Sequence, residues 1–287
     1  MHFVSDRKGS IIRENSFQDK ILAALYKTAF GRMVIKPLTL PVVSKIGGIF
    51  LDTGISKALI PSFIKSHSIH MEEYEQREYK SYNDFFQRRI LPGVREIDSS
   101  PDVLISPCDS RLSVCKISPN SVFSIKNTRY TAAGLLKDKN LAERFAGGYI
   151  WIFRLCVEDY HHYIYPERGR ASKSVRIPGI FHTVNPIAND YFPIYKENER
   201  EYCLIKTKNF GTLLQMEVGA LFVGKIKNKP GNRIVAKGEE KGNFAFGGST
   251  VILMTQKGKV SPDKDILINS MRGVETKVKL GEHVGVK

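Results

Sequence analysis

The chain has 287 residues, enough for one large domain or one domain with an appendage, and its 42% hydrophobic content permits a sizeable core. Lys and Arg outnumber Asp and Glu by 44 to 29, and the resulting charge of +15 favours an anionic partner, such as an acidic lipid surface or nucleic acid. Four scattered cysteines exclude a disulfide scaffold, no apolar run approaches the roughly 18–20 residues that span a bilayer, and the N-terminus lacks a signal-peptide core.

The first ninety residues are predicted to be mainly helical. Residues 16–30 carry apolar side chains at helical spacing after Ser16, a plausible N-cap, and a second helical stretch is expected at about 54–66. This pattern is typical of helices that pack on a soluble core. It also fits an interfacial amphipathic surface with basic flanks, suited to acidic lipid.

After residue 90 the sequence becomes rich in short β-prone runs separated by Gly, Pro and Asn. These runs predict a largely antiparallel, twisted sheet or a barrel-like, partly open core with few helices. No linker is long enough to separate independent domains. The fold class is therefore expected to be α+β, with a helical N-terminal region over 1–90 and a β-rich domain over 91–287.

Four short segments combine residue types that carry chemistry. An Asp, a His and a Ser brought together from separate loops can form a base-activated nucleophile, although any long chain offers such triples. A zinc site is not expected, because the Cys and His residues lack ligand-like spacing. The segments are SPCDSRL with Asp109, FRLCVEDYHHYIYPERG with Asp159, His161 and His162, FHTVNP with His182 and Asn185, and FGGST with Ser249.

Several segments together resemble one known family. KGEEKGNFAFGGSTVILM resembles the processing site of phosphatidylserine decarboxylase proenzymes, which depend on a pyruvoyl group. SYNDFFQRRILPGVREID, SPCDSRL, FRLCVEDYHHYIYP and QMEVGALFVGKI resemble four further motifs of that family. The matches run in the family's order from about residue 79 to 254, so together they are far more specific than any one of them.

The resemblance implies a self-inflicted break in the chain. Ser249 would attack the carbonyl of Gly248, and elimination would leave residues 1–248 as a β chain and 249–287 as an α chain. Ser249 would become an N-terminal pyruvoyl group, the only cofactor expected. A glycine before the serine suits this chemistry, because a carbonyl without a neighbouring Cβ can be approached closely.

The sequence departs from the family at the residue expected to act as the base in this step. The family uses an Asp–His pair, and Asp109 matches its aspartate, but Ile164 occupies the position of the histidine assigned as base. His161, His162 or His182 would have to substitute, with His162 nearest in sequence, or processing would be slow or absent. Successive strand residues face opposite sides, so only one of His161 and His162 is expected to point into the site.

The implied activity is the conversion of phosphatidylserine to phosphatidylethanolamine and CO₂ in phospholipid synthesis. His161 would donate a proton or position the substrate carboxylate. The chain would act as a peripheral protein on the cytoplasmic face of the cell membrane, docked on anionic lipid through residues 1–90. Its two chains would form a heterodimer, with a higher homo-oligomer left open.

Three alternative functions have less support in the sequence. The first is a processing-deficient, non-enzymatic member of the same fold, for which Ile164 is the motive. The second is a nucleic-acid-binding protein, but the sequence has no RNP-type aromatic run, no zinc-finger spacing and no arginine-dense helix. The third is a serine hydrolase, but residues 247–251 read GGSTV and not GxSxG.

Overall fold

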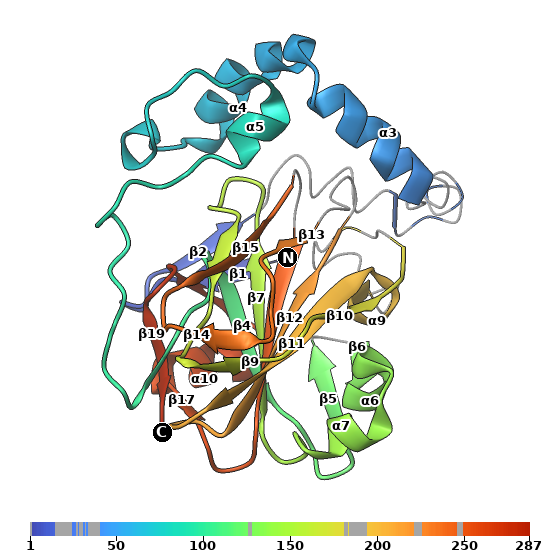
Figure 1. The fold of residues 1–287 in the computed structure, drawn as a ribbon, viewed down its shortest axis with the longest axis vertical. Helices are drawn as coiled ribbons and strands as arrows, with labels where there is room; N and C mark the ends of the chain where they lie inside the picture. The colour runs from blue at the N-terminus through green and yellow to red at the C-terminus, as the bar shows by residue number, and fades with distance from the viewer. Residues whose placement is uncertain are drawn as a thin grey trace.

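The protein is built around one long sheet with a helical segment at one end (Figure 1). The computed structural model describes residues 2–14, 25, 26, 28, 31, 33, 41–125, 128–180, 183, 194–220, 226–245 and 249–287. Within these residues every pairing between named strands is antiparallel, except that β1 runs parallel to β18. The expected mixed α+β class with mostly antiparallel strands is therefore confirmed.

The main sheet has 11 strands, and β16 lies near its middle between β12 and β7. Its order is β14-β9-β11-β12-β16-β7-β4-β18-β1-β2, and β10 pairs with β11. Because β14 and β2 end this order without pairing to each other, the described strands form no closed barrel. The bounds are β1 His2–Ser5, β2 Ile11–Glu14, β4 Ser110–Lys116, β7 Tyr149–Leu155, β9 Gly169–Ala171, β10 Val175–Ile177, β11 Arg200–Thr207, β12 Thr212–Val218, β14 Arg233–Val235, β16 Ser249–Thr255 and β18 Glu275–Val278.

Smaller sheets complete the β structure. One has the order β13-β15-β8, a second β17-β19-β3, and a third is the β5–β6 hairpin. The bounds are β3 Val103–Ile105, β5 Val122–Ile125, β6 Thr128–Thr131, β8 His162–Ile164, β13 Ile226–Asn228, β15 Glu240–Phe244, β17 Ser261–Pro262 and β19 His283–Val286.

The two faces of the main sheet belong to different cores. Along β16, Ile252 and Met254 join the core beneath α6, whereas Val251 and Leu253 join the core shared with β8 and β15. This alternation follows from the period of two along a strand. Ser249 lies two residues before Val251, so its side chain faces the second core.

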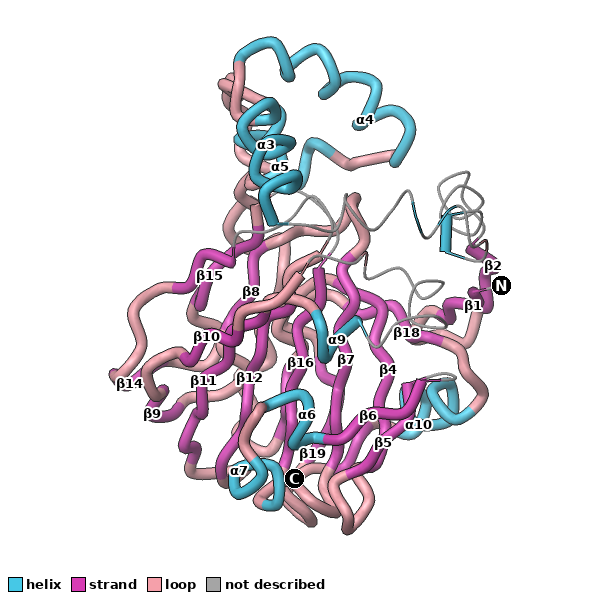
Figure 2. Tube along the Cα trace, turned by 90° about the vertical axis from the view of Figure 1, so that its right-hand side faces the viewer, coloured by secondary structure: helices cyan, strands magenta, loops and turns pink. Residues whose placement is uncertain are grey.

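The helices are short, and several begin at side-chain caps. Ser81 Oγ accepts from the Asp84 amide at the start of α5, and Thr131 and Asp138 do the same for α6 and α7. Figure 2 shows α3, α4 and α5 together above one end of the sheet. The bounds are α3 Pro41–Leu51, η1 Gly54–Leu59, α4 Ile60–His67, η2 Met71–Glu73, α5 Tyr82–Phe86, α6 Ala132–Leu136, α7 Lys139–Glu143, α9 Ile194–Glu197 and α10 Lys264–Met271.

The N-terminal region differs from the mainly helical segment expected over 1–90. It opens with the β1–β2 hairpin, which joins the main sheet through β18, and its described helices are short. The strands of this hairpin have only four residues each, and β1 pairs with β18 from the far end of the chain, so no local pattern announces them. The stretch predicted at 54–66 is helical as η1 and α4, whereas most of residues 16–30 lie outside the described residues.

Candidate active site

Ser249 is the first residue of β16 and is wholly buried. It lies opposite Leu155, the last residue of β7. Its hydroxyl oxygen has no hydrogen-bond partner in the part of the chain that the structure describes, a rare state for a buried polar atom. Gly248, on the other side of the predicted break, lies outside the described residues.

His161 lies in the connection that follows β7, just before β8. Its carbonyl accepts from the Phe244 amide, which ties it to the strand that leads toward Ser249. Its Nδ1 lies 2.8 Å from the Asp159 carbonyl, so Nδ1 carries the proton and Nε2 the lone pair. Nε2 is buried and has no partner among the described residues. Burial lowers the pKa of His161 to about 3, so the ring is neutral at pH 7.

His162 has surroundings that differ from those of His161. Its ring stacks on Tyr160 with centroids 4.8 Å apart, and its Nε2 lies 3.3 Å from the Gln87 carbonyl. Glu240 lies 3.6 Å from Nδ1, longer than a hydrogen bond, and the proximity of His162 is the largest influence that lowers the pKa of Glu240 to about 2. His162 therefore interacts with Glu240, away from the packing of His161 against Phe86.

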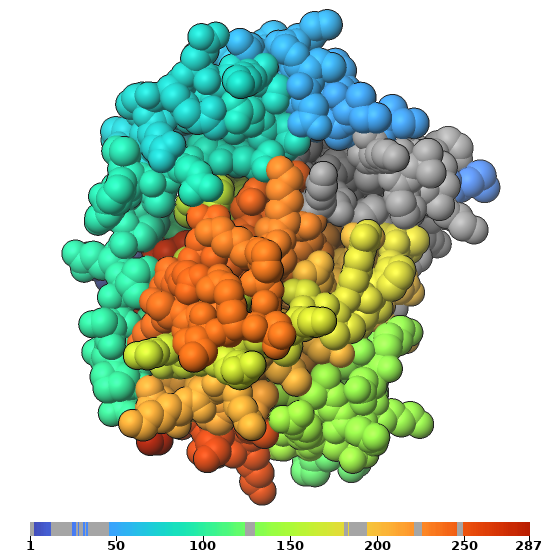
Figure 3. Space-filling view, in the orientation of Figure 1, coloured from blue at the N-terminus to red at the C-terminus, as the bar shows by residue number. Residues whose placement is uncertain are grey.

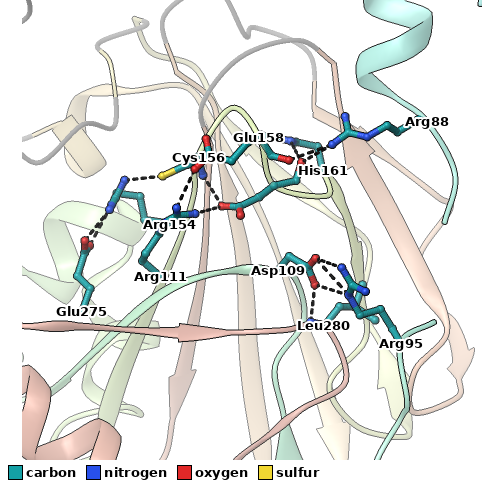
Figure 4. Close-up of polar contacts among 11 residues, drawn as sticks. Arg88, Arg95, Asp109, Arg111, Arg154, Cys156, Glu158, His161, Glu275 and Leu280 are labelled. Atoms are coloured by element: carbon teal, nitrogen blue, oxygen red, sulfur yellow. Dashed lines mark hydrogen bonds and ion pairs between the residues drawn. The ribbon is translucent and has the colours of Figure 1, made fainter. Parts of the chain in front are cut away.

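Asp109 is held by an arginine. Arg95 Nη2 and Nε lie 2.7 and 3.0 Å from its two carboxylate oxygens, and the Leu280 amide donates to Oδ1 at 2.7 Å (Figure 4). No hydrogen bond joins Asp109 to a histidine within the described ranges. The structure thus brings Ser249 and His161 onto neighbouring segments but gives Asp109 a different partner.

Ile164 contacts the loop that carries Asp109. Its amide donates to the Pro107 carbonyl at 2.9 Å, so the Asp109 loop runs along β8 at this point. The Ile164 side chain lines a pocket of about 200 Å³ together with Arg95, His162 and Leu280. Ile164 and Arg95, the partner of Asp109, therefore line the same pocket. His182 and Asn185, the other candidates from the sequence, fall outside the described residues.

Two buried arginines that the sequence analysis did not single out form ion pairs around the His161 loop. Arg111 binds Glu158 at 2.7 Å and Asp159 at 2.6 Å (Figure 4). Arg154 binds Glu275 through two contacts of 2.6 and 3.0 Å. These ion pairs fix the loop that carries His161 and link β7 to β18. The sequence feature that could have pointed to these ion pairs is the arginine in each of two segments that resemble family motifs, SPCDSRL and FRLCVEDY.

The described residues contain neither a cluster suited to a metal ion nor a helix suited to span a membrane. Across the described ranges, no group of three or more His, Cys, Asp or Glu side chains is placed to hold a metal ion. None of the described helices combines the length and apolar character needed to cross a bilayer.

Comparison with known proteins agrees with the motifs. The family model for phosphatidylserine decarboxylase matches residues 82–286. The chain is 43% identical over 276 residues to phosphatidylserine decarboxylase proenzyme 2 of Clostridium acetobutylicum, covering 96% of this chain and 94% of that protein. It is 40% identical to the proenzyme of Ruminiclostridium cellulolyticum, covering 93% and 91%. The chain therefore belongs to the phosphatidylserine decarboxylase family, whose members are lyases that remove CO₂.

Proposed function

We propose that this protein converts phosphatidylserine to phosphatidylethanolamine and CO₂ after cutting its own chain between Gly248 and Ser249. The observation that carries the proposal is the buried Ser249 hydroxyl, which has no partner among the described residues and lies at the head of a central strand, next to the segment of His161. A nucleophile that must attack the adjacent carbonyl is best left free of competing hydrogen bonds. The relatives named above are all called proenzymes, which agrees with a cleaved product.

The cut would yield residues 1–248 and 249–287, and the fold explains how both stay together. β16 is hydrogen-bonded on both sides by strands of the longer chain, β12 and β7. The pyruvoyl group formed from Ser249 would supply an electrophilic ketone that takes up the electrons released when CO₂ leaves. The surroundings of Ser249 fit such a group, because the residue is wholly buried and its hydroxyl has no partner within the described residues.

We assign the proton-transfer role at this site to His161. Its Nε2 lone pair is buried and unpartnered among the described residues, and Nδ1–H is fixed by the Asp159 carbonyl. That arrangement presents a neutral acceptor in fixed orientation, although a lowered pKa makes it a weak base. His162 is less suited, since its Nε2 lies 3.3 Å from the Gln87 carbonyl and its Nδ1 faces the Glu240 carboxylate at 3.6 Å. Asp109, locked by Arg95, would contribute negative charge without accepting the serine proton.

A membrane-facing role for the predicted 1–90 region belongs to the same proposal. Large apolar side chains are exposed on α3 and η1, including Ile49 at 59% and Ile55 at 78%. Figure 3 shows this segment gathered at one end of the molecule. Exposed apolar residues with basic neighbours such as Lys57 favour an anionic lipid surface. We place the protein as a peripheral protein on the cytoplasmic face of the cell membrane.

The test of the activity uses vesicles that contain phosphatidylserine labelled with ¹³C in its carboxylate. Purified protein is expected to release labelled CO₂, and the Ser249→Ala variant is expected to release none. Equal CO₂ release by the two proteins would refute the proposed function, as would none from a wild-type chain that has been cleaved.

A second candidate is an uncleaved, lipid-binding member of the family without activity. Ile164 and the Arg95–Asp109 ion pair favour it, because neither arrangement supplies the family's Asp–His pair. It predicts that wild-type protein binds anionic vesicles but remains a single chain.

A further inference from the structure

A wholly buried ion pair connects the two sheets near Ser249. The side chains of Glu217 on β12 and Lys241 on β15 are 0% and 1% exposed, and Lys241 Nζ lies 2.5 Å from Glu217 Oε2. Asn228 completes the group: its Oδ1 accepts from Lys241 at 2.9 Å, and its amide donates to Glu217 at 3.0 Å. Removing two charges from water is costly, and an apolar pair of similar volume is often at least as stable. Stability alone therefore does not explain this pair.

A local irregularity of β15 directs Lys241 inward. The register of β15 against β8 shifts between Glu240 and Gly242, so Lys241 is the extra residue of a β-bulge. Gly242 permits the bulge, because an added Cβ would come within 2.2 Å of the Lys227 carbonyl oxygen and 2.9 Å of the Tyr163 hydroxyl. Bulges often re-aim one side chain beside a functional site.

The pair also lies on the Ser249 face of the main sheet. Glu217 is directly opposite Val251, which is two residues after Ser249 and therefore on the same face. Residues diagonal to one another on adjacent strands lie about 7–8 Å apart, within reach of a long side chain. Glu217 Oε1 is buried and without a partner in the described part of the chain, as is the Ser249 hydroxyl.

We propose that Glu217 and Lys241 are positioning residues for self-cleavage, and that they hold the end of β15 in fixed alignment with the start of β16. β15 ends at Phe244, five residues before Ser249, yet β15 and β16 belong to different sheets. Their alignment depends on how the sheets are held together, and this pair joins β15 to the strand that is hydrogen-bonded to β16. The inference rests on the proposed self-cleavage and adds the residues that align it.

The experiment measures cleavage and stability separately. Wild-type protein and the double variant Glu217→Leu, Lys241→Met are made by cell-free translation, and conversion of the 287-residue chain to its fragments is followed over time. The double variant removes both charges and keeps the volume, so no unpaired charge is left to unfold the chain. Thermal midpoints are compared in the uncleavable Ser249→Ala background, where both proteins remain single chains.

The expected result is a double variant that keeps its thermal midpoint but is cleaved at least about tenfold more slowly, because small misplacements of reacting groups cost large factors in rate. Cleavage at the wild-type rate would overturn the inference. So would slow cleavage accompanied by a large fall in thermal midpoint, since that result indicates a general folding defect. A wild-type chain that is never cleaved would instead refute the proposed function.

Discussion

His161 and His162 are adjacent in the chain yet differ in chemistry. His161 is held by a backbone carbonyl, and its buried Nε2 has no partner in the described part of the chain, whereas His162 lies near Glu240 beside a small pocket. Strand alternation predicted from sequence that they would differ. It could not predict which one faces the interior, because that depends on how β8 packs against the main sheet.

The first prediction compares the three candidate histidines. His161→Ala is expected to slow self-cleavage by about 100-fold or more, in the range typical for loss of a general base, while His162→Ala and His182→Ala leave it within a few-fold of wild type. The ratio of cleaved to full-length chain on a denaturing gel over time measures this. Normal cleavage in all three variants would reject a histidine base altogether.

The second prediction concerns acid stability. Burial lowers the pKa of His161 to about 3 in the folded protein, whereas an unfolded histidine titrates near ~6.5. As the pH falls below 6.5, the unfolded chain binds this proton and the folded protein does not, so stability is lost. In the Ser249→Ala background, His161→Gln should lose about 2.5 kcal/mol less stability than its parent between pH 7 and 4.5. Urea unfolding at both pH values measures the difference, and equal losses would contradict the assignment.

Asp109 shows what the sequence could not reveal at the residue scale. Asp109 was proposed as a site residue because its segment resembles a family motif. Its principal partner, Arg95, lies 14 positions earlier, in another segment that resembles the family. Nothing in residue type or spacing indicated that an arginine would occupy the carboxylate. The Glu217–Lys241 pair was hidden for a similar reason, since Glu217 lies in a run that reads as an ordinary apolar strand.

At the scale of elements, the β-prone runs predicted β4, β7, β12 and β16 well, because each has seven residues, and β7, β12 and β16 are almost wholly buried. The β1–β2 hairpin was missed. Its strands have only four residues each, and β1 is stabilised by β18 from the other end of the chain. Such long-range pairing leaves no local pattern for sequence reasoning to detect.

The third prediction tests the connection between β7 and β18. Glu275→Ala removes the bidentate carboxylate from the buried Arg154 and is expected to destabilise the Ser249→Ala protein by about 3–5 kcal/mol. The matched control is Glu199→Ala, whose partner Arg176 is 66% exposed, and about 1 kcal/mol or less is expected there. Urea unfolding measures both variants, and similar losses would show that the buried pair has no special role.

The fourth prediction concerns η1. Ile55→Asp is expected to weaken binding to phosphatidylserine vesicles by about tenfold, because it replaces an exposed apolar contact with a charge that anionic lipid repels. Met271→Asp on α10 is the control, since Met271 is similarly exposed, at 80% against 78%, and both variants change the net charge by the same amount. Vesicle sedimentation measures binding. Equal losses in both variants would indicate only a general charge effect.

At the scale of the whole molecule, residues 249–287 are held by strand pairing and ion pairs to residues 1–248. β16 is sandwiched between two strands of residues 1–248, and Arg7 binds Asp263 and Asp265 near the opposite terminus. A cut before Ser249 would therefore leave one folded particle that carries a reactive group inside it. The overall charge of +15 suits a particle that works at an anionic surface.

Intact mass spectrometry of the purified protein under denaturing conditions tests the central claim most directly. The account predicts two chains, the shorter of 39 residues (287 − 248) and blocked at its N-terminus by pyruvoyl in place of serine. A single uncut chain of about 32.4 kDa would contradict it.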